Sequence, residues 1–272
     1  MKTIIVPTDY SENAWYATEY AAHVAQKTNA GIILFHAVDL PLITTEVPVD
    51  LPSLDELNRH HMARLQEIKT QLINKYHIQV TCKLSLGAVA EVLTRYFTEE
   101  KADLIIMGLR GTNPVGKLLM GSVTSTLLKR GDLPILVIPR DFSYKSIKHI
   151  MLASDFDSSC SLTPLRDMAE AFGAQVEVLR LPQPMPAGHS PERTASYTNF
   201  ENQLSGVKLE YTYLYGEDIQ RGIDQSVCES HSDLLVMIPH KYSFFERMFD
   251  RNNITKMAFH TKTPLLALPA EK

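Results

Sequence analysis

The chain repeats itself once, and this repeat limits the folds that are open to it. Residues 101–139 align with residues 231–269 without a gap, so that Asp103 matches Asp233. The start repeats as well, because the hexapeptide IIVPTD at residue 4 resembles IMLASD at residue 150. Each unit therefore has about 130 to 140 residues, the usual size of one domain. We expect two related domains that arose from one pattern.

The boundary between the two units falls in a short polar link near residues 140–144, after a strand pattern that ends in proline. We place the first domain at residues 1–140 and the second at residues 145–272.

Strand-like and helix-like patterns alternate within each unit. Strands of the first unit are expected at residues 3–6, 32–38, 79–85, 103–107 and 134–138. Its helices are expected at residues 11–28, 52–76, 88–100 and 119–130. Strands of the second unit are expected near residues 147–152, 175–181, 207–213, 233–238 and 265–268. This alternation is typical of a parallel sheet with helices on both faces.

The expected fold class is α/β, with two doubly wound parallel-sheet domains of five strands each in the order 3-2-1-4-5. In such sheets, ligands bind beyond the carboxyl ends of the strands, where the strand order reverses. Strands 1 and 4 flank that point. Asp9 follows the first strand, and the stretch 108–122 follows the fourth. Two polar features far apart in the sequence should therefore meet at one site.

Composition excludes several classes of function. The net charge of -4 leaves no basic excess for nucleic-acid binding. The three cysteines, Cys82, Cys160 and Cys228, are far apart, which favours a reducing compartment over a disulfide framework or a zinc knuckle. No run approaches the roughly 20 apolar residues of a membrane span, and the first apolar run is too short for a signal segment. We expect a cytoplasmic protein without nucleic-acid or membrane partners.

A glycine-rich stretch follows the fourth strand pattern of the first unit. It reads MGLRG from Met107, and GSVT follows at Gly121 after nine residues. Glycines at this spacing let backbone N–H groups approach a phosphate chain without a Cβ in the way. The helix pattern that starts at Ser122 adds a helix N-terminus, which favours anions. The stretch predicts nucleotide binding and by itself does not indicate chemistry.

Other interpretations of these residues stay open at this point. The glycines could serve only as turn residues, and Asp9 could serve only as the N-cap of a helix near Ser11. Residues 111–118 (GTNPVGKL) nearly spell a P-loop. We reject that interpretation because Leu118 stands where a Ser or Thr would hold magnesium. Lys117 then faces either the solvent or a phosphate.

The remaining polar residues form no assignable catalytic set or metal site. His60 and His61 are adjacent on a predicted helix and point to different faces, so joint metal ligation is not expected. His36 ends a buried strand pattern, which indicates a hydrogen-bonded core or rim residue. No Ser-His-Asp set and no general base can be assigned. We expect no catalytic residue and no metal ligand.

The motif Gly-x2-Gly-x9-Gly-Ser that begins at Gly108, with the opening VPTDYS at residue 6, resembles the ATP-binding motif and first loop of universal stress proteins. The whole chain resembles a tandem universal stress protein of the UspA family. The resemblance implies an adenine nucleotide alpha hydrolase-like fold for both domains. The second domain matches in its strand pattern and at Asp155, but not in its glycines.

The resemblance implies three groups of site residues. Those expected around the adenine are Pro7, Thr8, Asp9 and Val38. Those expected under the ribose and phosphates are Met107, Gly108, Arg110 and Gly111. Those expected to hold phosphate oxygens through backbone and hydroxyl groups are Gly121, Ser122, Val123 and Thr124. The implied ligand is ATP, or else AMP or ADP, and a role for Mg²⁺ is left open.

The second unit lacks every residue of the motif. In place of Gly108, Gly111, Gly121 and Ser122 it has Ile238, Lys241, Arg251 and Asn252. These side chains, with the nearby Phe244, Phe245 and Phe249, would fill the space that phosphates need. We expect a silent site whose loop packs on its own domain. A partner surface, a hydrophobic-ligand surface, or an anion site made by Lys241, Arg247 and Arg251 are the alternatives.

The preferred function is a nucleotide-binding regulatory protein of the stress response, with one nucleotide in the first domain and no more than weak ATPase activity. Slow ATP hydrolysis and an interaction scaffold with a structural nucleotide are the alternatives. Adenylyl transfer is disfavoured because the loop TDYSE at residue 8 carries neither a HIGH-type nor an SGGxDS-type motif. The resemblance also implies pairing of the two fifth strands as an internal pseudo-dimer, with a homodimer of whole chains left open.

Overall fold

The computed structural model describes residues 1–38, 53–109, 121–154, 160–180, 200–214, 219–238 and 263–269. The strands of the first half are β1 (Thr3–Pro7), β2 (Gly31–Val38), β3 (Val80–Leu86), β4 (Leu104–Gly108) and β5 (Ile135–Ile138). Those of the second half are β6 (His149–Ser154), β7 (Gln175–Arg180), β8 (Leu209–Tyr213), β9 (Leu234–Met237) and β10 (Leu265–Ala267). The predicted strands are all present, with ends shifted by a few residues.

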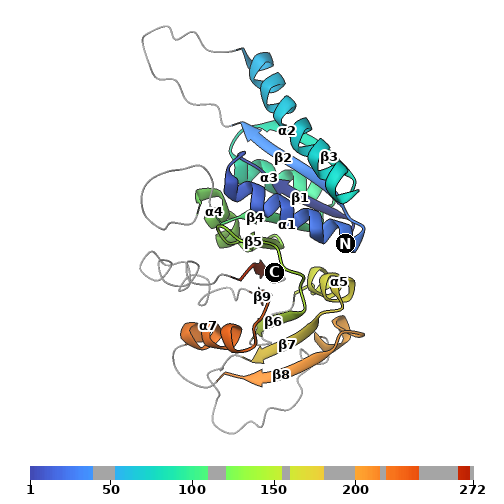
Figure 1. The fold of residues 1–272 in the computed structure, drawn as a ribbon. Helices are drawn as coiled ribbons and strands as arrows, with labels where there is room; N and C mark the ends of the chain where they lie inside the picture. Colours follow the sequence, from blue (N-terminus) through green and yellow to red (C-terminus); the bar gives the residue numbers. More distant parts are fainter. Residues whose placement is uncertain are drawn as a thin grey trace.

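The ten strands form one continuous sheet in the order β3-β2-β1-β4-β5-β10-β9-β6-β7-β8 (Figure 1). Each half has the predicted order 3-2-1-4-5, so the predicted fold class is confirmed. Every pairing within a half is parallel, whereas β5 and β10 pair antiparallel at the junction. Among the described strands, antiparallel pairing occurs at this junction, where the strands of the two halves run in opposite directions.

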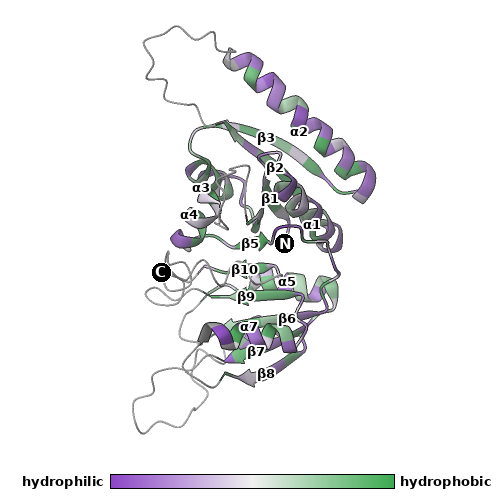
Figure 2. Ribbon diagram, turned by 60° about the vertical axis from the view of Figure 1, so that its left-hand side comes forward, coloured by the Kyte–Doolittle hydropathy of each residue, from purple (hydrophilic) through white to green (hydrophobic). Residues whose placement is uncertain are grey.

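Helices cover both faces of the sheet, as the alternating pattern predicted (Figure 1). They are α1 (Glu12–Thr28), α2 (Leu54–Tyr76), α3 (Val89–Glu99), α4 (Ser122–Arg130), α5 (Thr163–Phe172) and α7 (Ile219–Glu229). Successive strand residues point to opposite faces, so Ile4 joins the core under α1, α2 and α5, while Ile5 joins the core under α3, α4 and α7. Figure 2 shows the apolar colour concentrated on the strands.

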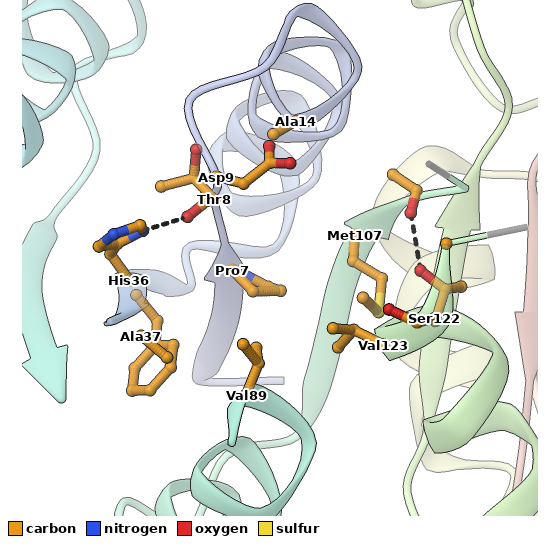
Figure 3. Close-up of a pocket in the computed structure, with 14 residues that line it drawn as sticks. Pro7, Thr8, Asp9, Ala14, His36, Ala37, Val89, Met107, Ser122 and Val123 are labelled. Atoms are coloured by element: carbon orange, nitrogen blue, oxygen red, sulfur yellow. Dashed lines mark hydrogen bonds between the residues drawn. The ribbon is translucent and has the colours of Figure 1, made fainter. Parts of the chain in front are cut away.

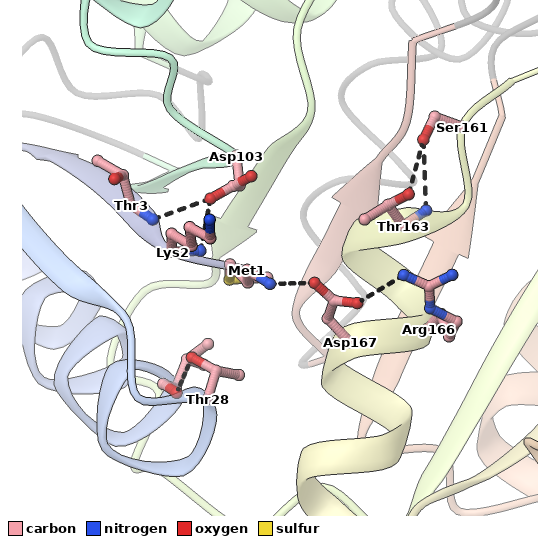
Figure 4. A network of polar contacts seen from close by, with 10 residues as sticks. Met1, Lys2, Thr3, Thr28, Asp103, Ser161, Thr163, Arg166 and Asp167 are labelled. Atoms are coloured by element: carbon pink, nitrogen blue, oxygen red, sulfur yellow. Dashed lines mark hydrogen bonds and ion pairs between the residues drawn. The ribbon is translucent and has the colours of Figure 1, made fainter.

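The two halves share one core across the β5–β10 junction. Leu136 and Leu266 lie opposite each other there, and both are fully buried. The apolar core under α1 and α5 includes residues of both halves. The amino group of Met1 also forms an ion pair with Asp167 on α5, which in turn accepts a hydrogen bond from Arg166 (Figure 4). The sheet, the core and this ion pair therefore join the two halves.

The aspartate that the repeat places at equivalent positions has the same role in both halves. The Oδ2 atom of Asp103 accepts hydrogen bonds from the backbone N–H groups of Lys2 (2.6 Å) and Thr3 (2.9 Å), as Figure 4 shows. The Oδ2 atom of Asp233 accepts from Lys148 (2.8 Å) and His149 (3.1 Å) in the same way. Each aspartate holds the start of the central strand of its half, which explains its place in the repeat.

Local signals fix the ends of the two longest helices. Ser53 caps α2 in a capping box with Glu56, and Ser11 caps α1. Asn29 and His77 end these helices in the left-handed conformation, with φ of 54° and 56°. Within the described parts of the chain, no helix is both long enough and apolar enough to cross a bilayer.

Candidate functional site

A pocket with a volume of about 270 Å³ opens between the carboxyl ends of β1 and β4, where the strand order reverses (Figure 3). This volume lies just below the range for small-molecule sites, which begins at about 300 Å³. The lining residues come from the two sides of one crevice in the first half of the chain. The ends of β1 and β2 form one side, and the end of β4 with the start of α4 forms the other. This is the position that the doubly wound topology predicts for a ligand.

Most of the site residues predicted from the sequence line this pocket. They are Pro7, Thr8, Asp9, Met107, Gly108, Gly121, Ser122, Val123 and Thr124. Val38 is not among the lining residues; its carbonyl accepts a hydrogen bond from the N–H of Gly87 (3.0 Å). Arg110 and Gly111 lie outside the described residues, as do Lys117, Leu118 and Asp155. The loop of the second half, with Lys241, Phe244, Phe245, Arg247, Phe249, Arg251 and Asn252, also lies outside them.

The loop after β1 is folded by its own side chains. The Oγ1 atom of Thr8 accepts a hydrogen bond from the N–H of Tyr10 (3.0 Å). The Oδ1 atom of Asp9 accepts one from the N–H of Ser11 (3.0 Å), which makes an Asx turn. Ser11 is the N-cap of α1, because its Oγ atom accepts from the N–H of Ala14 (3.1 Å). The interpretation of Asp9 as the N-cap is therefore wrong, because Ser11 occupies that position.

The other side of the pocket is a helix N-terminus. Gly121 is the N-cap of α4, and the first helical hydrogen bond runs from the N–H of Ser125 to the Gly121 carbonyl (2.9 Å). The N–H groups of the first turn therefore have no carbonyl acceptor within the helix. Among the described residues, no side chain caps α4, and its first turn contains no acidic residue. This end of the helix can accept an anion through backbone N–H groups and the helix dipole.

Thr124 also ties α4 to the end of β4. Its Oγ1 atom donates a hydrogen bond to the carbonyl of Gly108 (3.0 Å), and its side chain is buried. The hydroxyl proton of Thr124 is thus used within the protein, whereas Ser122 in the same turn is exposed. Of the two hydroxyl groups in this turn, that of Ser122 is the one open to a ligand.

His36 is a lining residue whose role sequence reasoning missed. Its Nδ1 atom lies 2.7 Å from the carbonyl oxygen of Thr8, and this carbonyl can only accept, so Nδ1 carries a proton (Figure 3). Burial lowers the pKa of His36, and the charge of Arg64 lowers it further, against the opposing effects of the Thr8 bond and Asp9. The sequence placed His36 at the core or rim, which agrees with its bonded, half-buried ring but not with its position in the pocket wall.

The other lining residues without a sequence signal are small or apolar. They are Ala14, Phe35, Ala37 and Val89. The register Pro7↔Phe35 places this part of β2 beside the end of β1, so the positions of Phe35 and Ala37 follow from strand pairing rather than from any motif. Val89, the first residue of α3, contributes an apolar side chain to the same pocket (Figure 3).

The chemistry of the lining favours binding. Asp9 and His36 are the ionisable residues among the described residues that line the pocket. In the described part of the chain, no cluster of His, Cys, Asp and Glu could hold a metal ion. Apolar side chains such as Val89 and Met107 line the pocket together with the polar groups at the start of α4. This arrangement suits a ligand with one flat apolar part and one anionic part.

Comparison with known proteins identifies a family for the first half of the chain. The profile of the universal stress protein family matches residues 1–139. A universal stress protein of Methanocaldococcus jannaschii is 25% identical over 141 residues, which cover 51% of this chain and 82% of the relative. A universal stress protein of Thermus aquaticus is 29% identical over 140 residues, which cover 50% of this chain and 98% of the relative.

Both halves have counterparts in a solved structure. The crystal structure of a universal stress protein from Archaeoglobus fulgidus matches with a TM-score of 0.72 over 98% of each chain, at 17% sequence identity. At this identity the match shows a shared fold, and it extends over the second half as well as the first. On the family match over residues 1–139, this chain belongs to the universal stress protein family.

Proposed function

We propose that this protein is a cytoplasmic regulatory protein of the stress response. It would bind an adenine nucleotide, with ATP as the preferred ligand, in the pocket of its first half. The observation that carries the proposal is the convergence of Asp9 and the start of α4 on one pocket at the point where the strand order reverses. A helix N-terminus without a side-chain cap among the described residues offers an anion site at one end of that pocket.

The two ends of the pocket would take different parts of the nucleotide. The base would lie at the β1–β2 end, where Pro7, Ala37 and Val89 offer apolar surface and Asp9 offers an acceptor. The phosphates would lie against α4, where the N–H groups of its first turn and the hydroxyl of Ser122 are available. Binding would regulate the protein by differential affinity for two conformations or assemblies.

The second half would act as a structural partner rather than as a second nucleotide site. It has Ile238 where the first half has Gly108, and this residue packs against the apolar core rather than leaving the strand end open. The antiparallel pairing of β5 with β10 supports an internal pseudo-dimer in which the silent half completes the sheet of the binding half.

The predicted stoichiometry is one adenine nucleotide per chain, because one half keeps the motif glycines and the other replaces them. Mass spectrometry of the co-purifying small molecule should identify the nucleotide. Isothermal titration of the stripped protein with ATP should then give a stoichiometry of one. Two equivalent sites would contradict the silent second half, and the absence of any adenine nucleotide binding would contradict the proposed function.

A further inference from the structure

A cluster of rings lies behind the pocket wall and connects it to α2. The ring centroids of Tyr10 and His36 are 4.5 Å apart, and those of His36 and His61 are 4.4 Å apart. The guanidinium carbon of Arg64 lies 4.0 Å from the centroid of the Tyr10 ring. We name these four residues the histidine cluster. Because His36 lines the pocket while His61 and Arg64 belong to α2, the cluster joins α2 to the pocket wall.

Hydrogen bonds hold the rings of the cluster in place. The hydroxyl of Tyr10 donates to the backbone carbonyl of His61 (3.1 Å), and Nδ1 of His36 donates to the carbonyl of Thr8 (2.7 Å). Tyr10 has a φ of 65°, a conformation that bulky residues rarely adopt and that surrounding contacts must maintain. Burial raises the pKa of Tyr10 to about 12, so its hydroxyl remains a donor at neutral and acidic pH.

The closed cluster suits neutral imidazoles. The Nδ1 atom of His61 is buried and, among the described residues, has no hydrogen-bond partner, so a proton added there would lack an acceptor. Burial lowers the pKa of His61, and the charges of His36, His60 and Arg64 lower it further. His36 is likewise shifted down, first by burial and then by Arg64.

Groups on every neighbouring element act on these two histidines. From the β1–α1 loop, Asp9 favours a charged His36 and so opposes the effect of burial on it. From α2, His60 and Arg64 disfavour charge on His61. From β3, Cys82 faces Tyr10 as a neutral thiol, because burial raises its pKa. A cavity of about 350 Å³ beside Tyr10 and Arg64 brings two more carboxyl groups close to the cluster, those of Glu12 from α1 and Glu67 from α2. It has room for the water that would carry protons to the cluster.

We propose that the histidine cluster is a proton-sensitive latch that holds α2 against the wall of the ligand pocket and releases it on acidification. Its sign follows from linkage. A histidine whose pKa is lower in the closed state than in the open state binds protons more weakly in the closed state. The closed state is therefore favoured at pH values above the open-state pKa of about 6.5, and this preference is lost as the pH falls from that pKa through the lower pKa of the closed state. Closure should therefore be complete at pH 7.5 and weakened at pH 5.5.

The latch should change the ligand site because His36 belongs to both. Release of α2 would remove His61 from the ring of His36, and a charged His36 would alter the wall beside the base. This consequence rests on the proposed function, whereas the release of α2 does not. Acidification should then lower the affinity for ATP at the same pH at which α2 opens.

Hydrogen exchange of the protein without nucleotide, at pH 7.5 and pH 5.5, tests the latch. Expressed as protection factors, which remove the intrinsic effect of pH, the protection of residues 54–65 should fall at the lower pH. The opening constant should rise by at most about tenfold per pH unit for each histidine that takes up a proton. The protection of α1 should not change. Equal protection of residues 54–65 at the two pH values would overturn the proposal.

Two substitutions on α2 make the test specific. His61→Phe keeps a ring in the cluster but cannot titrate at this position. The fall in protection of residues 54–65 between pH 7.5 and pH 5.5 should therefore be smaller than in the wild type, because only His36 of the two cluster histidines can still take up a proton. His77→Asn is the matched control: it removes the histidine that ends α2, at a φ of 56° that asparagine tolerates, and should respond like the wild type. A His61→Phe variant that responds like the wild type would overturn the latch.

Two further measurements separate the latch from the proposed function. In an NMR titration of the wild type, the His61 ring should titrate below its ordinary value of about 6.5, and titration at or above it would contradict the latch without any variant. Between pH 7.5 and pH 5.5, ATP affinity should fall further in the wild type than in His61→Phe. The ratio of the two affinities removes the effects of ATP's own titration and of His36, which are present in both proteins. Failure to bind ATP at pH 7.5 would contradict the proposed function, while hydrogen exchange would still decide the latch.

Discussion

Replacing Gly121 by valine is expected to weaken ATP binding by about 100-fold or more, equivalent to roughly 2.7 kcal/mol. Gly121 lines the pocket and is the N-cap of α4, so added carbon atoms would occupy space next to the N–H groups that would face the proposed nucleotide. The backbone of Gly121, with φ of -57° and ψ of 143°, is one that valine adopts readily. A loss of affinity would therefore report on space in the pocket and not on backbone strain.

The control for this substitution is a glycine in the same half that lies away from the pocket. Gly31 begins β2, and a Cβ added there would approach no atom closer than 3.9 Å. Gly31→Ala should leave ATP affinity within about twofold of the wild type, as expected for a change in ordinary contact. Titration calorimetry of both variants, with circular dichroism to confirm folding, makes the comparison. A folded Gly121→Val protein with wild-type affinity would show that the nucleotide does not lie against α4.

The fold was predictable from the sequence because its signals are local and repeated. Buried parallel strands read as continuous apolar runs, such as LIIM at residue 104 and LLVM at residue 234, and both are β-strands in the structure. Asp103 and Asp233 stood out as a repeated pair for a reason that the structure supplies, since each holds the start of a central strand. Right-handed connections then favoured a doubly wound sheet, and the order 3-2-1-4-5 is one of the strand orders that such a sheet can take.

The site was predictable only where glycine spacing or a loop marked it. His36 carried no such mark, because its part in the pocket depends on the pairing of β2 with β1 and on a bond to Thr8, which lies 28 positions away in the sequence. The contact of His61 with His36 depends on how α2 packs over β2, and the sequence showed only two adjacent histidines on a helix. Asp9 and Ser11 are both good caps, and only the hydrogen bonds show that Ser11 is the N-cap.

Replacing Leu266 by alanine is expected to lower the free energy of unfolding by about 2–5 kcal/mol, the range for a leucine lost from a packed core. Leu266 is fully buried and lies opposite Leu136 across the β5–β10 junction. The core that contains it includes residues of both halves, so the cavity would weaken the first half as well as the second. The chain's single tryptophan, Trp15, lies on α1 and makes this coupling measurable.

In urea unfolding, Trp15 fluorescence reports on the first half and circular dichroism reports on both, so the Leu266→Ala substitution should move the two midpoints together. The matched control is Leu86→Ala on β3, because Leu86 is 41% exposed and its loss should change stability by no more than about 0.5 kcal/mol. A Leu266→Ala protein whose fluorescence midpoint stays at the wild-type value while a separate transition appears by circular dichroism would show that the halves unfold independently. Joint movement of the midpoints would instead identify the antiparallel junction as the contact through which the silent half stabilises the half that carries the pocket.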